Sequence, residues 1–187
     1  GLAAATISAQ RGHNVTLFDA DKEIGGQFNL AKQIPGKEEF YETLRYFNKQ
    51  IALHLVELKL NTRVTNEDLI KSDFDEIILA TGIQPRALTI EGIEHQKVLS
   101  YLDVLKLKKP VGKRVAVIGA GGIGFDVSEY LSHEGAATSQ NIDAWLKEWG
   151  IDKTLGARSG IENVKTEFHS SPREIFMFKR SKGKFGG

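Results

Sequence analysis

Apolar residues in the first half of the chain follow helix spacing and strand spacing in turn. Residues 1–12 have a narrow apolar side and end at Gly12, which suits the left-handed end of a helix. Residues 38–55 carry apolar side chains at helical spacing, which predicts an amphipathic helix. Residues 14–20 and 56–64 have the composition and alternation of short strands. The apolar run within residues 74–82, FDEIILATG, is typical of a buried parallel strand.

The second half of the chain repeats this order. A connector with two prolines and a short helical stretch covers residues 83–113. An apolar strand, a glycine-rich turn and a helix then follow over residues 114–135. Residues 135–173 are polar and irregular, except that residues 141–151 suit an amphipathic helix. The last predicted strand is EIFMFKR, at residues 174–180.

Strands that alternate with helices indicate an α/β fold with parallel sheets. The repeated order predicts two Rossmann-like nucleotide-binding units joined near residues 84–112. We expect one parallel sheet in each unit, with strands near residues 15–19, 56–62, 76–80, 115–119 and 175–179.

The strongest chemical signal is VAVIGAGGIG at residues 115–124, where a strand leads through a GxGxxG sequence into a helix. In such a loop Gly119 permits the tight turn, and Gly121 lets the backbone approach a pyrophosphate. Gly124 lets the helix pack closely on the strand, and the helix N-terminus faces the anion. We therefore predict a dinucleotide site; the alternative is a glycine-rich turn without a ligand.

The first residues of the chain resemble the end of a second loop of this kind. An acidic residue that binds a ribose hydroxyl lies about 20 residues beyond such a loop, and Asp19 follows Gly1 by 18 positions at the end of a strand. Gly1 would then be the third glycine of the loop, so we expect this chain to be a fragment of a longer protein.

Two further loops are candidate cofactor contacts. Gly25 and Gly26 permit close backbone contact, and Gln27 and Lys37 are polar groups nearby; a plain surface loop is the alternative. The sequence LATG, ending with Ala80, Thr81 and Gly82, closes a predicted buried strand with small residues.

The end of the last predicted strand bears on the choice of nicotinamide cofactor. Arg180 stands where the matching strand of the first unit has an acid, and a guanidinium can bind a 2′-phosphate with two hydrogen bonds. Arg180 lies 56 residues after Gly124, so this prediction needs residues 135–173 to be an insertion. A solvated basic tail is the alternative.

Composition narrows the function classes. The 25 Lys and Arg residues nearly balance the 24 Asp and Glu residues, so no global basic field suggests nucleic acid. The chain has no cysteine, which excludes disulfides, thiolate catalysis and iron–sulfur ligation within it and suits a cytoplasmic protein. The five histidines show no metal-ligand spacing, and we expect no catalytic residue and no metal in this chain. No apolar run is long enough to cross a bilayer and no signal peptide is visible, so we expect no membrane partner.

Several segments together resemble flavoproteins of the pyridine-nucleotide–disulfide-reductase type. The resemblance is closest to bacterial NADPH-dependent 2,4-dienoyl-CoA reductases, and it runs over nearly the whole chain. It rests on TLFDADKEIGGQFNLAKQIPGKEEFYETLRYF, VLSYLDVL, VAVIGAGGIGFDVSEYLS, TSQNIDAWLKEWGID and SPREI.

The resemblance implies a cytoplasmic oxidoreductase of unsaturated fatty acid β-oxidation. NADPH would reduce FAD, and electrons would pass through a [4Fe–4S] cluster to FMN, which reduces the dienoyl-CoA in a barrel outside this chain. The FAD contacts implied are Asp19 at the ribose with Gln27, Lys37, Val64 and residues 80–82, and the NADPH contacts are Gly119, Gly121, Ile123 and Gly124.

The implied organisation is a pair of nested FAD- and NAD(P)-binding domains, both incomplete. Residues 1–110 would be a partial FAD domain with its connector, and residues 111–187 a partial NADPH domain with a long insert. The barrel and the cluster cysteines are missing, so we expect the isolated chain to be inactive. Another barrel flavoprotein, such as an amine dehydrogenase or an NADH:flavin oxidoreductase, is the alternative parent.

Overall fold

The computed structural model describes residues 1–154, 156–160 and 165–184 of the 187-residue chain. Its contacts divide the chain into two compact units. The first contains Gly1–Leu30 and Glu39–Glu91, and the second contains Ala31–Glu38 and Gly92–Gly187. The predicted domain boundary at residue 110 stays a prediction.

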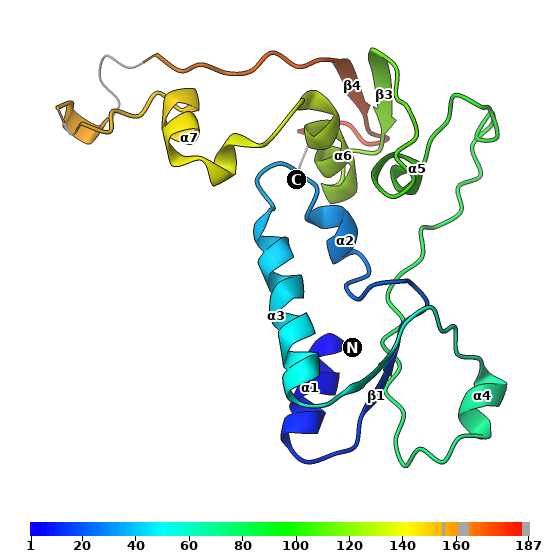
Figure 1. The fold of residues 1–187 in the computed structure, drawn as a ribbon. Coiled ribbons are helices and arrows are strands. Elements are labelled where there is room, and N and C mark those ends of the chain that lie inside the picture. Colours follow the sequence, from blue (N-terminus) through cyan, green and yellow to red (C-terminus); the bar gives the residue numbers. More distant parts are fainter. Residues whose placement is uncertain (155, 161–164, 185–187) are drawn as a thin grey trace. The chain divides into compact units, whose positions relative to one another are not determined.

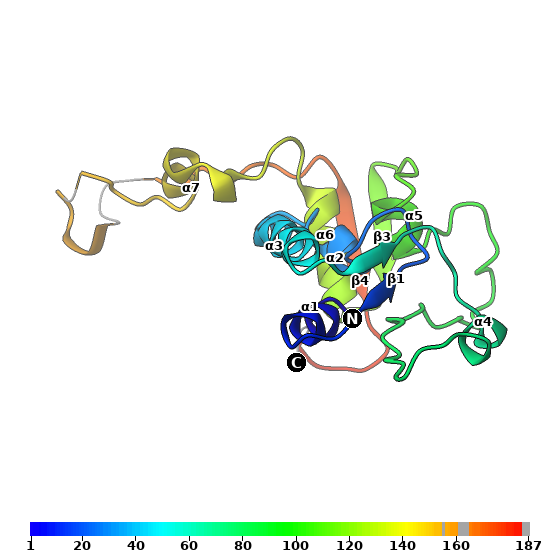
Figure 2. The same cartoon turned by 60° about the horizontal axis from the view of Figure 1, so that its bottom comes forward.

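The first unit packs helices against a two-stranded parallel sheet (Figure 1). Strand β1 pairs with β2 in parallel register, from Thr16 opposite Glu57 to Phe18 opposite Lys59. Helices α1 and α3 contact each other, and both are viewed nearly along their axes in Figure 2. The elements are α1 (Leu2–Gln10), β1 (Thr16–Phe18), α3 (Glu39–Leu53), β2 (Glu57–Lys59) and α4 (Asn66–Ile70), with α2 (Phe28–Ala31) crossing into the second unit.

The core of this unit explains why these segments form helices. Ala5 of α1 and Ile51 of α3 are buried together with Ile24 and Val56, so the predicted apolar faces meet. Helix α1 ends at a glycine of positive φ, as predicted: Gly12 has a φ of +92° and donates a backbone hydrogen bond to the carbonyl of Ala9.

The prediction of a buried strand at residues 76–80 is wrong. This segment forms no strand, and the side chains of Ile78 and Leu79 are 67% and 76% exposed. In the part of the chain that the structure describes, no strand lies beside it to complete a ladder. A parallel strand gains its stability from neighbours on its edges and faces, so apolar composition alone does not hold this segment in a sheet.

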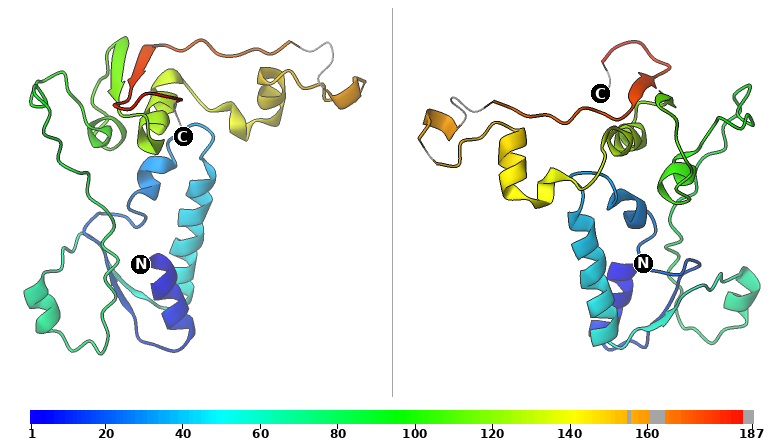
Figure 3. Two further views of the ribbon diagram at one scale, coloured as in Figure 1. Left: turned by 180° about the vertical axis from the view of Figure 1, so that it is seen from behind. Right: turned by 45° about the horizontal axis from the view of Figure 1, so that its top comes forward.

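The second unit contains the other parallel pair, visible in Figure 3 as the green β3 beside the red β4. The register runs from Arg114 opposite Glu174 to Ile118 opposite Phe178, and α6 follows β3 directly. The predicted strands at residues 115–119 and 175–179 are therefore confirmed, shifted by one position. The elements are α5 (Tyr101–Leu105), β3 (Arg114–Ile118), α6 (Gly122–Ser132), α7 (Ile142–Glu148) and β4 (Glu174–Phe178), with short 3₁₀ turns at Thr138–Gln140 and Arg158–Gly160.

The predicted insert at residues 135–173 contains α7 and the two 3₁₀ turns. Its residues 155 and 161–164 lie outside the described part of the chain. Despite the length of this segment, β4 pairs directly with β3. No helix in the described residues is long and apolar enough to span a membrane.

Candidate nucleotide-binding sites

The glycine loop between β3 and α6 has the backbone that its sequence predicts. Gly119 follows the last residue of β3 with a φ of +118°, a conformation that strains any residue with a side chain. Its amide donates to the carbonyl of Phe178 at 2.8 Å, which fixes the start of the loop against the end of β4. Gly121 is the N-cap of α6, so the free amides of the first turn of α6 begin here.

Gly121 and Gly124 differ in what a side chain would meet. A Cβ on Gly124 would lie 1.9 Å from the carbonyl oxygen of Gly119, so the helix can pack this closely only with glycine there. A Cβ on Gly121 would meet no atom within 4 Å, so the space next to its backbone is open. The loop therefore fits a group that approaches the backbone at Gly121, as the pyrophosphate of a dinucleotide does.

The other two predicted NADPH contacts lie at the start of α6 and beyond β4. Ile123, in the first turn of α6, is 50% exposed. Arg180 is exposed and stands two positions after Phe178, the last residue of β4. Because β3 and β4 are parallel neighbours, their carboxyl ends share one edge of the sheet. Arg180 therefore follows the strand next to the glycine loop, as the insertion hypothesis requires.

Asp19 follows β1 at the carboxyl edge of the first sheet. It is half-buried, and its side chain accepts a hydrogen bond from the amide of Asp21 at 2.9 Å. Its backbone carbonyl accepts from the amide of Thr62, two positions before Val64. These bonds hold the Asp19 carboxylate at the end of a strand, where the acidic residue of a ribose site lies.

Val64 lines a cavity of about 380 Å³ on the same edge of this sheet. The sequence analysis did not identify the other residues of this cavity, because they come from β1, β2, α4 and the coil on either side of α4 and share no motif. The lining residues are Phe18, Lys59, Thr62, Arg63, Val64, Asp68, Leu69, Ser72 and Phe74.

Residues 80–82 lie in exposed coil next to the start of α1. A Cβ on Gly1 would lie 3.5 Å from the Cβ of Ala80, so these two predicted contacts are neighbours. Gly82 has a φ of +76°, which favours glycine. Thr81 is exposed.

The Gly25–Gly26–Gln27 loop is shaped by packing against α3. Gly25 has a φ of +119°, and a Cβ there would lie 2.6 Å from a methyl carbon of Leu44. Gly26 also has a positive φ, of +50°, and a Cβ on it would meet nothing within 4 Å. Gln27 is exposed, and its backbone carbonyl accepts a hydrogen bond from Leu30.

Lys37 is separated from the other predicted FAD contacts by its place in the second unit. Its ammonium donates to the carboxylate of Asp126 on α6 at 2.6 Å. Asp126 comes two positions after the last glycine of the loop, and no sequence motif identifies it as a contact.

Comparison with known proteins places this chain in a family. The sequence profile of the pyridine nucleotide-disulphide oxidoreductases matches residues 1–157. Cinnamate reductase of Clostridium sporogenes is 36% identical over 140 residues, which are 72% of this chain and 20% of that protein. N,N-dimethylglycine/sarcosine dehydrogenase of Chromohalobacter salexigens is 33% identical over 186 residues, which are 95% of this chain and 26% of that protein.

A solved structure agrees with these sequence relatives. The structure of 2-naphthoyl-CoA reductase with 2-naphthoyl-CoA matches 70% of this chain and 20% of its own, with a TM-score of 0.67 and 34% identity. The chain thus spans 20% to 26% of the length of these three relatives. The profile match and the parallel βαβ geometry agree, and this chain belongs to the pyridine nucleotide-disulphide oxidoreductase family, with a Rossmann-like fold for FAD and NAD(P).

Proposed function

We propose that this chain is the electron-input segment of an NADPH-dependent 2,4-dienoyl-CoA reductase. The observation that carries the proposal is the unit formed by β3, the glycine loop, α6 and β4, with Arg180 following β4. This unit offers an open backbone for a pyrophosphate at Gly121 and a guanidinium beyond the neighbouring strand.

The NADPH site uses backbone and charge in separate places. The amides at the start of α6, from Gly121 through Ile123 to Gly124, are donors for the pyrophosphate. Arg180 would bind the 2′-phosphate, because a planar guanidinium pairs with a phosphate through two hydrogen bonds. A carboxylate at this position would instead repel that group.

The FAD site uses Asp19 for ribose hydroxyls and the cavity beside Val64 for an apolar part of the cofactor. Gly1, the Gly26–Gln27 loop and residues 80–82 would approach the same cofactor through backbone and small side chains. Lys37 would contact it only when released from Asp126. When bound, NADPH would supply a hydride for FAD, and the residues named above would hold the two cofactors.

The substrate side of the reaction lies outside this chain. We place FMN, a [4Fe–4S] cluster and the dienoyl-CoA site in other parts of the parent protein, because the chain has no cysteine to hold the cluster. Two relatives have names that indicate reduction of unsaturated substrates, cinnamate reductase and 2-naphthoyl-CoA reductase. These names support a substrate with conjugated double bonds.

An amine-oxidising flavoprotein is the second candidate. The alignment with N,N-dimethylglycine/sarcosine dehydrogenase extends over 95% of this chain, including its insert, so the insert alone does not favour a reductase. An NADH:flavin oxidoreductase is a further alternative among the barrel flavoproteins. In either case the isolated segment would bind nucleotides without turning over a substrate.

The deciding experiment is a turnover assay on the full-length protein that carries this sequence. Oxidation of NADPH should depend on an added 2,4-dienoyl-CoA and not on cinnamate, sarcosine or dimethylglycine. If sarcosine or dimethylglycine reduces the bound flavin and the dienoyl-CoA has no effect, the reductase assignment is wrong and the parent protein is an amine dehydrogenase.

The cofactor preference has its own test. Arg180→Ala should weaken NADPH binding by roughly tenfold or more and change NADH binding little, because only NADPH has the phosphate that a charged hydrogen bond stabilises. Arg86→Ala, at an exposed arginine of the first unit, is the matched control. An equal loss for both cofactors would refute the role of Arg180.

A further inference from the structure

A polar cavity of the second unit lies at the opposite edge of its sheet from the glycine loop. Its volume is about 480 Å³, and its lining includes Lys108, Lys109, Lys113 and Arg173. Lys113 and Arg173 immediately precede β3 and β4, so the cavity is at the amino edge of this sheet.

The strand register brings two of these cations together. Arg114 pairs with Glu174 as the first residue pair of the ladder, and the amide of Glu174 donates to the carbonyl of Lys113 at 2.8 Å. Lys113 and Arg173 therefore lie side by side just before two adjacent strands, although 60 positions separate them in the sequence. The described residues offer no acceptor for the Lys113 ammonium.

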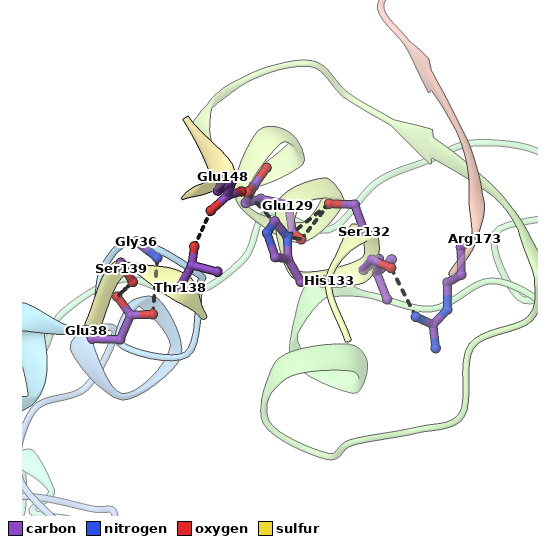
Figure 4. Close-up of polar contacts among 10 residues, drawn as sticks. Gly36, Glu38, Glu129, Ser132, His133, Thr138, Ser139, Glu148 and Arg173 are labelled. Atoms are coloured by element: carbon purple, nitrogen blue, oxygen red, sulfur yellow. Dashed lines mark hydrogen bonds and ion pairs between the residues drawn. The ribbon is translucent and has the colours of Figure 1, made fainter. Parts of the chain in front are cut away.

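Arg173 carries a donor that the described residues leave unused. Its Nη1 donates to the carbonyl of Leu131, near the end of α6, at 3.0 Å. Figure 4 shows a dashed line that starts at the Arg173 guanidinium. Its Nε is buried, and no acceptor in the described part of the chain reaches it. A buried charged donor without an acceptor is costly, and the residue that carries it lines the cavity.

The two remaining lysines are held by neighbouring side chains. The Lys108 ammonium donates to the hydroxyl of Tyr130 at 3.0 Å and lies 4.8 Å from the centre of that ring. The Lys109 ammonium is 2.5 Å from a carboxylate oxygen of Asp103. These contacts already restrict the two lysine side chains, so a ligand that binds there loses less free energy in ordering them.

The negative groups at the cavity are fewer than the cations. Glu134 is the one carboxylate among its lining residues, and Asp103 is paired with Lys109. The carbonyl end of α6 is also negative, but its Leu131 carbonyl already accepts from Arg173. The local balance is positive, although the net charge of the whole chain is only +1.

We propose that this cavity binds the phosphate group of a small molecule, at a site separate from the glycine loop. The Arg173 guanidinium belongs to the cavity lining and can donate to a phosphate oxygen, and the lysine ammonium groups neutralise its charge. The volume is within the range of small-ligand sites and larger than one ion requires. The ligand is therefore a phosphate carried on a small polar group rather than the free ion alone.

Calorimetric titration of the full-length protein tests this proposal. The protein is first saturated with FAD and NADP⁺, so that the nucleotide sites are occupied, and is then titrated with inorganic phosphate, ribose 5-phosphate or ribose. Both phosphates should bind and ribose should not. Ribose 5-phosphate should bind more tightly than inorganic phosphate. Equal affinity for these two ligands would refute the inference that the natural ligand carries its phosphate on a small polar group.

Substitutions of residues that line the cavity test whether ribose 5-phosphate binds there. Lys113→Gln and Arg173→Lys should each weaken ribose 5-phosphate binding by about tenfold, the effect of losing one charged hydrogen bond. Lys97→Gln, at an exposed lysine of the connector that is not among the lining residues, should leave it unchanged. Arg173 also supports the end of α6, so Lys113→Gln is the variant that separates binding from folding. Absence of phosphate binding, or equal binding by Lys113→Gln, would overturn the proposal.

Discussion

Gly124→Ala tests whether the close contact between α6 and the glycine loop holds this unit together. The added methyl carbon would lie 1.9 Å from the carbonyl oxygen of Gly119 and 3.0 Å from its carbonyl carbon. Both contact atoms belong to the backbone, so neither can rotate away as the end of a side chain would. The helix or the loop must move.

The size of the effect follows from the distance. Carbon and carbonyl oxygen atoms approach to about 3.3 Å, so α6 must shift by about 1.4 Å from its present 1.9 Å contact. Overpacking of this kind lowers the free energy of unfolding by about 3 kcal/mol, and the higher helix propensity of alanine raises it by about 1 kcal/mol. The expected net loss is about 2 kcal/mol, which is roughly a thirtyfold change in an opening equilibrium.

Hydrogen exchange of the full-length protein measures this loss locally. Amides of β3 and α6 should lose roughly thirtyfold in protection in Gly124→Ala. Gly121→Ala is the matched control, because its φ of −94° suits any residue and its Cβ meets nothing within 4 Å. That control should keep the protection of the parent but bind NADP⁺ more weakly. Equal protection in the two variants would show that the packing argument is wrong.

Two further predictions concern ion pairs of the second unit. Hydrogen bonds from Lys109 and from Ser100, the N-cap of α5, hold the pKa of Asp103 well below its ordinary value. The stability that this carboxylate contributes is therefore fully present above the ordinary pKa. It is lost as the pH falls through the lower pKa of the folded state. Lys109→Met should therefore raise the Asp103 pKa in a carbon-13 NMR titration, and an unchanged value would refute the pairing. Asp126→Asn should lower the free energy of unfolding by less than about 1 kcal/mol, because its pair with Lys37 is partly exposed. Adding Lys37→Met to Asp126→Asn should lower the free energy of unfolding no further. If the losses of the two single variants add up fully in the double variant, the two charges do not interact.

The sequence by itself determined the βαβ character of both units. Local periodicity predicted α1, α3, β3 and β4 because each has an apolar side that must be covered, and this requirement acts over a few residues. The glycine loop was equally local: positive φ at Gly119 and the close approach at Gly124 both demand glycine. These features are therefore visible in the sequence without knowledge of the partners.

Tertiary structure alone decided which segments became neighbours. Residues 76–80 have the composition of a buried strand but lie in exposed coil, because a strand also needs a paired edge. Lys37 has a partner on α6, 89 positions away, and Lys113 lies beside Arg173 through the register of β3 and β4. Such contacts depend on long-range pairing of backbone groups and charges, and no periodicity within a single segment specifies the partner.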